Sequence, residues 1–185
     1  MDSIPVHALW LAQDDPKKNT AVLASKRGDL TLHKNVRSLP KRGVILEPLC
    51  GKVFGPEDHE LLTQRGGALV GLDCSWAHIE TSVESVMKRT RLQPRMLPLL
   101  LAANPVNWGK PGRLTTAEAL ATVLYLVGRR DQAADVLGAF RWGGRFFELN
   151  QEPLDAYASA TSSQQLVDLQ FDFFDIERPA EGDES

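Results

Sequence analysis

The sequence lacks the features that define several large classes of protein. It has only two cysteines in 185 residues, Cys50 and Cys74, so it supplies neither a disulfide framework nor a four-thiolate zinc site. No apolar run approaches the roughly 20 residues that a membrane-spanning helix needs, and the N-terminus carries no basic segment followed by an apolar signal sequence. These absences predict a soluble cytoplasmic protein with reduced thiols and no membrane partner.

The motifs of several enzyme classes are missing too. The sequence contains no G-x-G-x-x-G fingerprint, no Walker A loop, no H-E-x-x-H zinc motif and no G-x-S-x-G nucleophile elbow. Its four histidines are scattered without metal-ligand spacing, at His7, His33, His59 and His78. We therefore expect no metal site, and the sequence supports neither a phosphate-loop enzyme nor a serine hydrolase.

Positive charge is almost absent from the C-terminal end. Residues 151–185 hold one arginine against nine acidic residues, whereas residues 1–150 hold 20 lysines and arginines against 15 acidic residues. The net charge of −3 thus conceals a basic body, which suits a polyanionic partner or is simply a solvated surface. Residues 176–185 have almost nothing to bury and are expected to form a disordered acidic tail.

The apolar pattern predicts an α/β fold that turns mostly helical near residue 110. We expect an α/β N-terminal lobe at 1–110 and a helical C-terminal lobe at 111–175, in one domain. The expected strands are 4–12, 43–48, 68–73 and a Leu-rich run at 95–101. The expected helices begin near residues 56, 75, 115, 131, 152 and 163, and residues 141–150 are expected to be irregular.

Two strand ends carry candidate functional residues. After the Leu-rich run, Asn104 and Asn107 flank Pro105, so a stiffened turn is expected to present two amides to a ligand, unless it is an ordinary turn. The other strand delivers Asp73 and Trp76 to its end. Farther along, residues 115–118 have the spacing of a capping box, which places a helix N-terminus ready for an anion.

Six blocks of the sequence, taken in order, resemble one family. They are Asp15-Pro-Lys-Lys-Asn-Thr20, Leu72-Asp-Cys-Ser-Trp76, Arg95-Met-Leu-Pro98, Leu101-Ala-Ala-Asn-Pro-Val-Asn-Trp-Gly109, Leu114-Thr-Thr-Ala-Glu-Ala119, and Phe140-Arg-Trp-Gly143 with Phe147-Glu-Leu-Asn150. The sequence resembles the small-subunit ribosomal RNA aminocarboxypropyltransferases of archaea and eukaryotes. Two positions depart from the family pattern: Asn19 stands where Cys is common, and Trp108 where Tyr is usual.

This resemblance implies a SPOUT-like fold, with an α/β N-terminal lobe and a helical C-terminal lobe that contains a trefoil knot. It also implies S-adenosylmethionine as the donor, whose 3-amino-3-carboxypropyl group is moved to N3 of a uridine or N1-methylpseudouridine in small-subunit rRNA. Methylthioadenosine is then released. The implied partner is small-subunit rRNA or the pre-ribosomal small subunit, and we expect the enzyme to be a monomer.

The same resemblance suggests where the donor binds. Leu46, Pro48 and Leu97 are expected around the adenine, Thr20 at the ribose, Trp76 along the aminocarboxypropyl arm, and Thr115 or Thr116 at the carboxylate. Asp73 either anchors the ammonium group of the arm or accepts the N3 proton, and both roles stay open. The expected RNA-binding residues are Lys17, Lys18, Lys88, Arg89, Arg91 and Arg95.

Two alternatives fit much of the same pattern. A SPOUT-class RNA methyltransferase would use the same donor but release S-adenosylhomocysteine. A ribosome-assembly factor that binds rRNA without chemistry would need the basic body, but it has no evident need for Asp73 and Trp76 together at the end of a buried strand.

Overall fold

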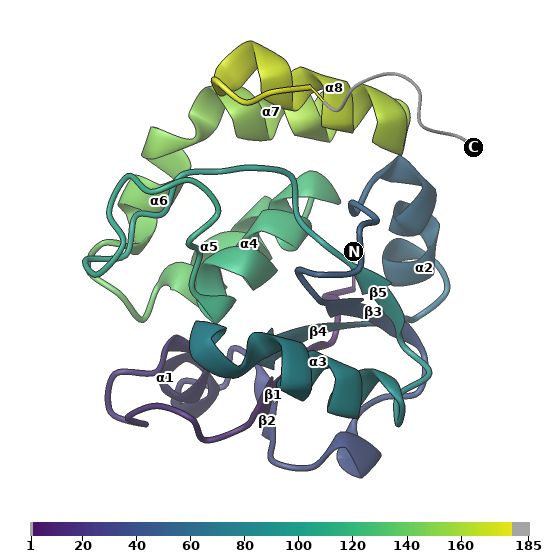
Figure 1. The fold of residues 1–185 in the computed structure, drawn as a ribbon, viewed down its shortest axis with the longest axis vertical. Helices are drawn as coiled ribbons and strands as arrows, with labels where there is room; N and C mark the ends of the chain where they lie inside the picture. Colours follow the sequence, from purple (N-terminus) through teal and green to yellow (C-terminus); the bar gives the residue numbers. More distant parts are fainter. Residues whose placement is uncertain (1, 179–185) are drawn as a thin grey trace.

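A five-stranded parallel sheet forms the centre of the computed structural model, which describes residues 2–178 (Figure 1). The strand order is β2-β1-β4-β3-β5, and all four neighbouring pairs run parallel. The carboxyl ends of the strands therefore share one edge of the sheet. The strands are β1 (Val6–Trp10), β2 (Thr31–His33), β3 (Gly43–Leu46), β4 (Ala68–Asp73) and β5 (Gln93–Arg95).

Helices connect the strands and make up every described element after β5. Short 3-10 helices occur at η1 (Val36–Ser38), η2 (Pro56–Asp58) and η3 (Trp76–His78). The α-helices are α1 (Thr20–Lys26), α2 (His59–Thr63), α3 (Ile79–Met87), α4 (Thr116–Leu126), α5 (Arg130–Leu137), α6 (Gly143–Leu149), α7 (Gln151–Ser159) and α8 (Ser163–Phe173). The change from alternating elements to helices after β5 agrees with the sequence prediction.

The expected SPOUT-like fold with a trefoil knot is wrong. The structure is an α/β fold in which a five-stranded parallel sheet is covered by helices, and β4 lies between β1 and β3. The resemblance depended on six short blocks of sequence. Such blocks identify residues at a site, but they do not determine the path of the chain between them.

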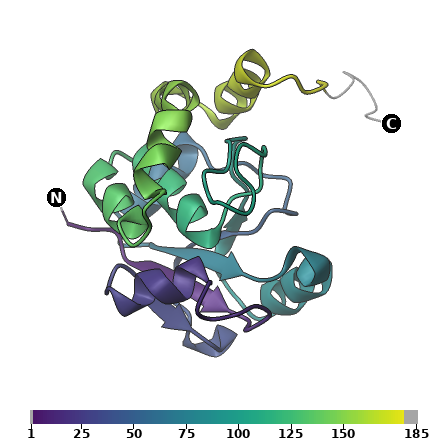
Figure 2. The ribbon, with the colours of Figure 1, turned by 90° about the vertical axis from the view of Figure 1, so that its left-hand side faces the viewer.

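The sheet is buried on both faces, as expected for a parallel sheet. On one face, Val6, Val44 and Leu69 join a large apolar cluster that also contains residues of α1 and of helices α4 to α8. On the other face, Ile45 and Val70 pack in a smaller cluster with residues of α3 and the loops beside it. Figures 1 and 2 both show α7 and α8 together at one end of the molecule, far from β2.

Two local predictions differ from the structure. The expected strand at 95–101 is reduced to β5 and two isolated bridges, Met96 with Val53 and Leu101 with Pro111, because the Leu-rich run continues past the last residues of β3 that pair with it. Residues 141–150, expected to be irregular, contain α6, where Phe146 is fully buried in the core. Glycines lowered the helical signal of that segment, and packing of the aromatic side chains restored it.

Of the predicted acidic tail, residues 179–185 lie outside the described part of the chain. Within residues 2–178, no helix combines the length and apolar character needed to cross a bilayer.

The fully buried carboxylate of Glu118 holds the long segment between β5 and α4. Its Oε1 accepts hydrogen bonds from the backbone N–H groups of Ala103, at 2.7 Å, and Asn104, at 3.1 Å. Its Oε2 accepts bonds from the Asn104 side chain, at 2.9 Å, and from both the backbone N–H and the hydroxyl of Thr115, at 2.7 and 2.9 Å. One side chain therefore joins the two ends of the loop at 104–115.

We predict that Glu118→Gln lowers the free energy of unfolding by about 2–4 kcal/mol, because the new NH2 group faces donors that then lose a charged acceptor. Chemical denaturation measures this loss. Glu148→Gln, at an exposed position of α6, is the matched control and should change stability by less than about 0.5 kcal/mol. Equal effects of the two substitutions would contradict the role given to Glu118.

Candidate functional site

A cleft of about 330 Å³ lies at the carboxyl edge of the sheet, beyond the ends of β3, β4 and β5. Its walls come from the residues that follow these strands, from the first turns of η3 and α3, and from the segment that leads into α4. Most of the lining side chains are apolar. Ligands of open α/β sheets bind at this edge, so the cleft is the candidate functional site.

Six of the eight residues predicted to bind the donor line this cleft. They come from four separate parts of the chain and are Leu46, Pro48, Trp76, Leu97, Thr115 and Thr116. The other two, Asp73 and Thr20, lie directly behind the lining. Asp73 stands between the lining residues Leu72 and Cys74, and the Thr20 hydroxyl accepts a hydrogen bond from Ala117 N, one residue past Thr116, at 3.2 Å.

Trp76 stands at the mouth of the cleft with 47% of its surface exposed. It is the first residue of η3, whose N-terminus is capped by the hydroxyl of Ser75. Across the opening, the guanidinium of Arg113 lies 5.3 Å from the centre of the indole ring. The ring is thus held by a cation–π contact but keeps surface for a ligand.

Asp73 ends β4 and is 9% exposed. Burial, with repulsion from Asp14, raises the pKa of its carboxyl group from 3.8 to about 6, although the nearby Asn19 and Thr116 side chains oppose the rise. Its buried Oδ2 accepts no hydrogen bond within the described structure. A buried carboxylate without a full set of donors is costly, so a proton or a positive charge beside Asp73 would lower this cost.

The thiol of Cys74, next to Asp73, is a poor nucleophile at neutral pH. Cys74 lines the cleft, and burial, together with the charges of Asp73 and Glu47, raises the pKa of its thiol to about 11. The thiol form dominates at neutral pH, and only the thiolate is a good nucleophile. Cys74 therefore contributes shape to the cleft, and it does not compete for an electrophilic ligand.

The N-terminus of α4 points its positive end at the cleft. Thr115 caps this helix, and the predicted capping box with Glu118 is confirmed. Gly71 of β4 lets the helix approach closely, because a Cβ atom there would lie 2.8 Å from Cγ2 of Thr116. The close approach places the first turn of α4 beside Asp73, so a positive helix end and a carboxylate adjoin one cleft.

Most of the predicted RNA-binding residues are exposed. Lys17 and Lys18 lie in the loop before α1, and Arg89 and Arg91 follow α3. Lys88 is exposed as well and pairs with Glu84 at 2.8 Å.

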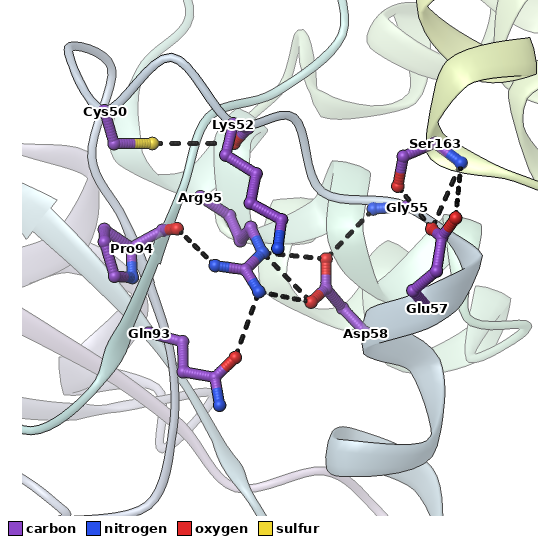
Figure 3. A network of polar contacts seen from close by, with 9 residues as sticks. All are labelled: Cys50, Lys52, Gly55, Glu57, Asp58, Gln93, Pro94, Arg95 and Ser163. Atoms are coloured by element: carbon purple, nitrogen blue, oxygen red, sulfur yellow. Dashed lines mark hydrogen bonds and ion pairs between the residues drawn. The ribbon is translucent and has the colours of Figure 1, made fainter.

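Arg95 does not lie on that surface, and the prediction is corrected. It is 7% exposed, and its Nε donates to both oxygens of Asp58 at 2.9 and 3.0 Å. Figure 3 shows the guanidinium enclosed by Asp58, Pro94 and Gln93. Asp58 is 37 residues away in the chain, so no local spacing predicts this pair, and the basic cluster around Arg95 is misleading.

Asn104 does not present its amide to a ligand as expected. It is 3% exposed, and its side chain bonds Glu118, the carbonyl oxygen of Arg113 and the backbone N–H of Asn107. Its role is to shape the turn.

Sequence analysis missed three side chains that hold the cleft wall. The backbone of Leu99, a lining residue, donates its N–H to Gln170 of α8 at 2.8 Å and accepts the hydroxyl hydrogen of Tyr157 of α7 at 2.9 Å. Asn150 pairs with both backbone groups of Leu101, at 2.8 and 2.9 Å. Side chains of the C-terminal helices thus add to the backbone pairing that this segment makes with residues 110–112. Only Asn150 carried a signal, as the last residue of the Phe147-Glu-Leu-Asn150 block.

Comparisons with known proteins give consistent matches over most of the chain. Residues 44–174 match the family described as "Ribosome biogenesis protein, C-terminal". The 16S rRNA aminocarboxypropyltransferase of Methanothermobacter thermautotrophicus is 40% identical over 159 residues, which cover 86% of this chain and 92% of the relative. The enzyme of that name from Methanopyrus kandleri is 42% identical with the same coverage.

A solved structure supports both the fold and the family. The structure of the SAM-dependent rRNA:acp-transferase from Vulcanisaeta distributa is similar with a TM-score of 0.77 and 33% sequence identity, covering 91% of this chain and 96% of that one. Together these matches show that the chain belongs to the ribosome biogenesis family that includes the archaeal 16S rRNA aminocarboxypropyltransferases.

Proposed function

We propose that this protein is an S-adenosylmethionine-dependent aminocarboxypropyltransferase that acts on small-subunit rRNA. The observation that carries the proposal is the pairing of opposite charges beside an apolar cleft. The first turn of α4, whose Thr115 and Thr116 line the cleft, suits a carboxylate, and the buried carboxyl group of Asp73 suits an ammonium group. An α-amino acid carries both groups on one carbon, and the donor ends in an α-amino acid.

The remaining features of the cleft fit the rest of the donor. A volume of about 330 Å³ lies within the range of small-molecule sites. Leu46, Pro48 and Leu97 offer apolar surface for an adenine ring, and Trp76 offers an aromatic face for the arm next to the sulfonium. Thr20, expected at the ribose, lies instead behind the lining at the start of α4, and we place it near the amino-acid end of the donor.

When bound, the donor supplies an electrophilic Cγ carbon, to which N3 of a uridine-type base bonds as the C–S bond breaks and methylthioadenosine leaves. The methyl carbon on the same sulfur is also electrophilic, so the protein selects between them by position. Fixing the carboxylate at α4 and the ammonium at Asp73 orients the arm. The open side of Trp76 leaves a path for the base.

Two roles were open for Asp73, and its burial favours the anchor. A carboxylate that is 9% exposed is accessible to a small ammonium group more readily than to a base attached to RNA. The N3 proton then leaves to solvent, because the imide is itself weakly acidic. Lys17, Lys18, Lys88, Arg89 and Arg91 remain the proposed phosphate contacts, without Arg95.

The by-product of the reaction tests the function directly. We predict that the protein, incubated with S-adenosylmethionine and unmodified small-subunit rRNA, forms methylthioadenosine and a nucleoside heavier by one aminocarboxypropyl group, both read by mass spectrometry. Release of S-adenosylhomocysteine with a methylated nucleoside would instead establish methyl transfer. If the protein binds the RNA but forms neither product, it would be an assembly factor and not an enzyme.

We predict that Trp76→Ala weakens donor binding about tenfold, because the arm and the sulfonium lose an aromatic face. Isothermal calorimetry with S-adenosylmethionine measures the change. Trp108→Ala removes another exposed tryptophan that is not part of the lining, and it should leave donor affinity unchanged. Equal affinities for the two variants would remove Trp76 from the donor site.

Asp73→Asn should stabilise the donor-free protein near pH 7.5 by up to about 3 kcal/mol. The pKa of Asp73 is raised by about two units on folding, and each unit costs the ionised protein about 1.4 kcal/mol. The folded protein holds the Asp73 proton up to about pH 6, whereas the unfolded chain releases it near 3.8. The wild type therefore loses stability as pH rises through this window, and the gain from the amide shrinks as pH falls towards 4. Denaturation at several pH values measures this, with the exposed Asp131→Asn as control.

The same variant separates the two roles of Asp73. An anchor predicts weaker donor binding and nearly normal turnover at saturating donor. Unchanged donor affinity, with turnover that recovers at alkaline pH as N3 ionises without help, would show that Asp73 is the base.

A further inference from the structure

The loop at 104–113 exposes large side chains that the donor site does not use. Val106 is 84% exposed and Trp108 is 51% exposed, which are high values for apolar side chains of this size. Lys110 and Arg113, in the same loop, are exposed as well. The loop therefore joins two exposed apolar side chains to two exposed basic ones.

The backbone of this loop is held firmly, although its side chains face outwards. Gly109 N donates to the carbonyl oxygen of Ala102 at 2.7 Å, and Gly112 N donates to that of Leu100 at 2.9 Å. Inside the loop, the Asn104 side chain accepts from Asn107 N at 3.0 Å and donates to the carbonyl oxygen of Arg113 at 3.2 Å. Trp108 is therefore presented from a prearranged backbone, which reduces the entropy lost when it binds a partner.

The loop continues into the wall of the donor cleft. Gly112 and Leu114 line the cleft, and Arg113 reaches over the ring of Trp76 at its mouth. A partner seated on Trp108, Lys110 and Arg113 would thus extend up to the opening through which the acceptor base must enter.

The charge of this part of the chain selects the kind of partner. No Asp or Glu occurs from residue 85 to residue 117, a stretch that holds six lysines and arginines. Arg95 is neutralised by Asp58, and the others are exposed. A stretch without acidic residues that carries an exposed aromatic ring matches single-stranded RNA, in which unpaired bases stack on aromatic side chains while lysines and arginines bind the phosphates.

We propose that the 104–113 loop is a docking platform for the nucleotides that flank the modified base, with Trp108 stacking on one of them and Lys110 and Arg113 binding adjacent phosphates. The inference rests on the proposed function, because it assigns the RNA side of the same site. Stacking next to the target holds the strand open, so the acceptor base is free to turn into the cleft past Trp76.

The test is the affinity of the full-length protein for a small-subunit rRNA hairpin, measured with and without Trp108. Trp108→Ala should weaken binding about tenfold, within the range for the loss of one stacked base, while calorimetry shows donor affinity unchanged. Trp108→Phe keeps an aromatic face and should recover most of the loss. Ile176→Ala, another exposed apolar position, is the control and should bind RNA like the wild type.

A second measurement examines the phosphate contacts. Lys110→Gln should flatten the dependence of log affinity on log salt concentration by about one unit. Lys41→Gln, at an exposed site just before β3 and so at the opposite edge of the sheet, should leave the slope unchanged.

The outcomes separate the platform from the enzyme. If the wild type forms methylthioadenosine but Trp108→Ala binds the hairpin equally well, the platform is wrong and the function stands. If only binding to the assembled small subunit falls, and binding to the naked hairpin does not, Trp108 contacts a protein and the proposal is overturned. If the wild type neither binds the hairpin nor forms product, both are wrong.

Discussion

The arrangement of the site depends on one buried carboxylate. Glu118 accepts five hydrogen bonds from three residues at the two ends of a loop, and it does so from the first turn of the helix whose N-terminus faces the cleft. The same charge thus fixes the helix start, the cleft wall and the exposed loop relative to one another. A buried charge with its hydrogen bonds satisfied by the backbone specifies geometry that apolar packing alone leaves adjustable.

Asp73, whose chain neighbours Leu72 and Cys74 line the cleft, is a buried carboxylate with too few hydrogen-bond donors. Its carboxylate is buried like that of Glu118 but lacks a full set of donors, and its pKa is raised accordingly. The protein therefore carries an unfavourable charge in its donor-free state, which a ligand ammonium would compensate. Destabilised groups of this kind are common at functional sites, and this contrast is the reason to propose a functional role for Asp73 and a structural one for Glu118.

The predicted donor residues lie together in the structure, whereas the predicted fold was wrong. The resemblance to the family suggested the six donor residues that line the cleft, whereas local patterns alone pointed only to two strand ends and a capping box. The path of the chain depends on contacts between residues far apart in the sequence, and the expected knot was wrong. Arg95 and Asn104 were misplaced because their partners, Asp58 and Glu118, are distant in the chain. Tyr157 and Gln170 were missed because nothing in their own neighbourhood marks them as partners of Leu99.

The dependence of Leu99 on those two residues has a consequence for the order in which the protein matures. A ribosome delivers the sheet and most of the cleft wall first, while Gln170 emerges 71 residues after Leu99. A nascent chain that ends after β5 contains all five strands, but it lacks Tyr157 and Gln170, the partners of Leu99. The cleft wall at Leu99 therefore gains its last hydrogen-bonding partner only when α8 has been synthesised.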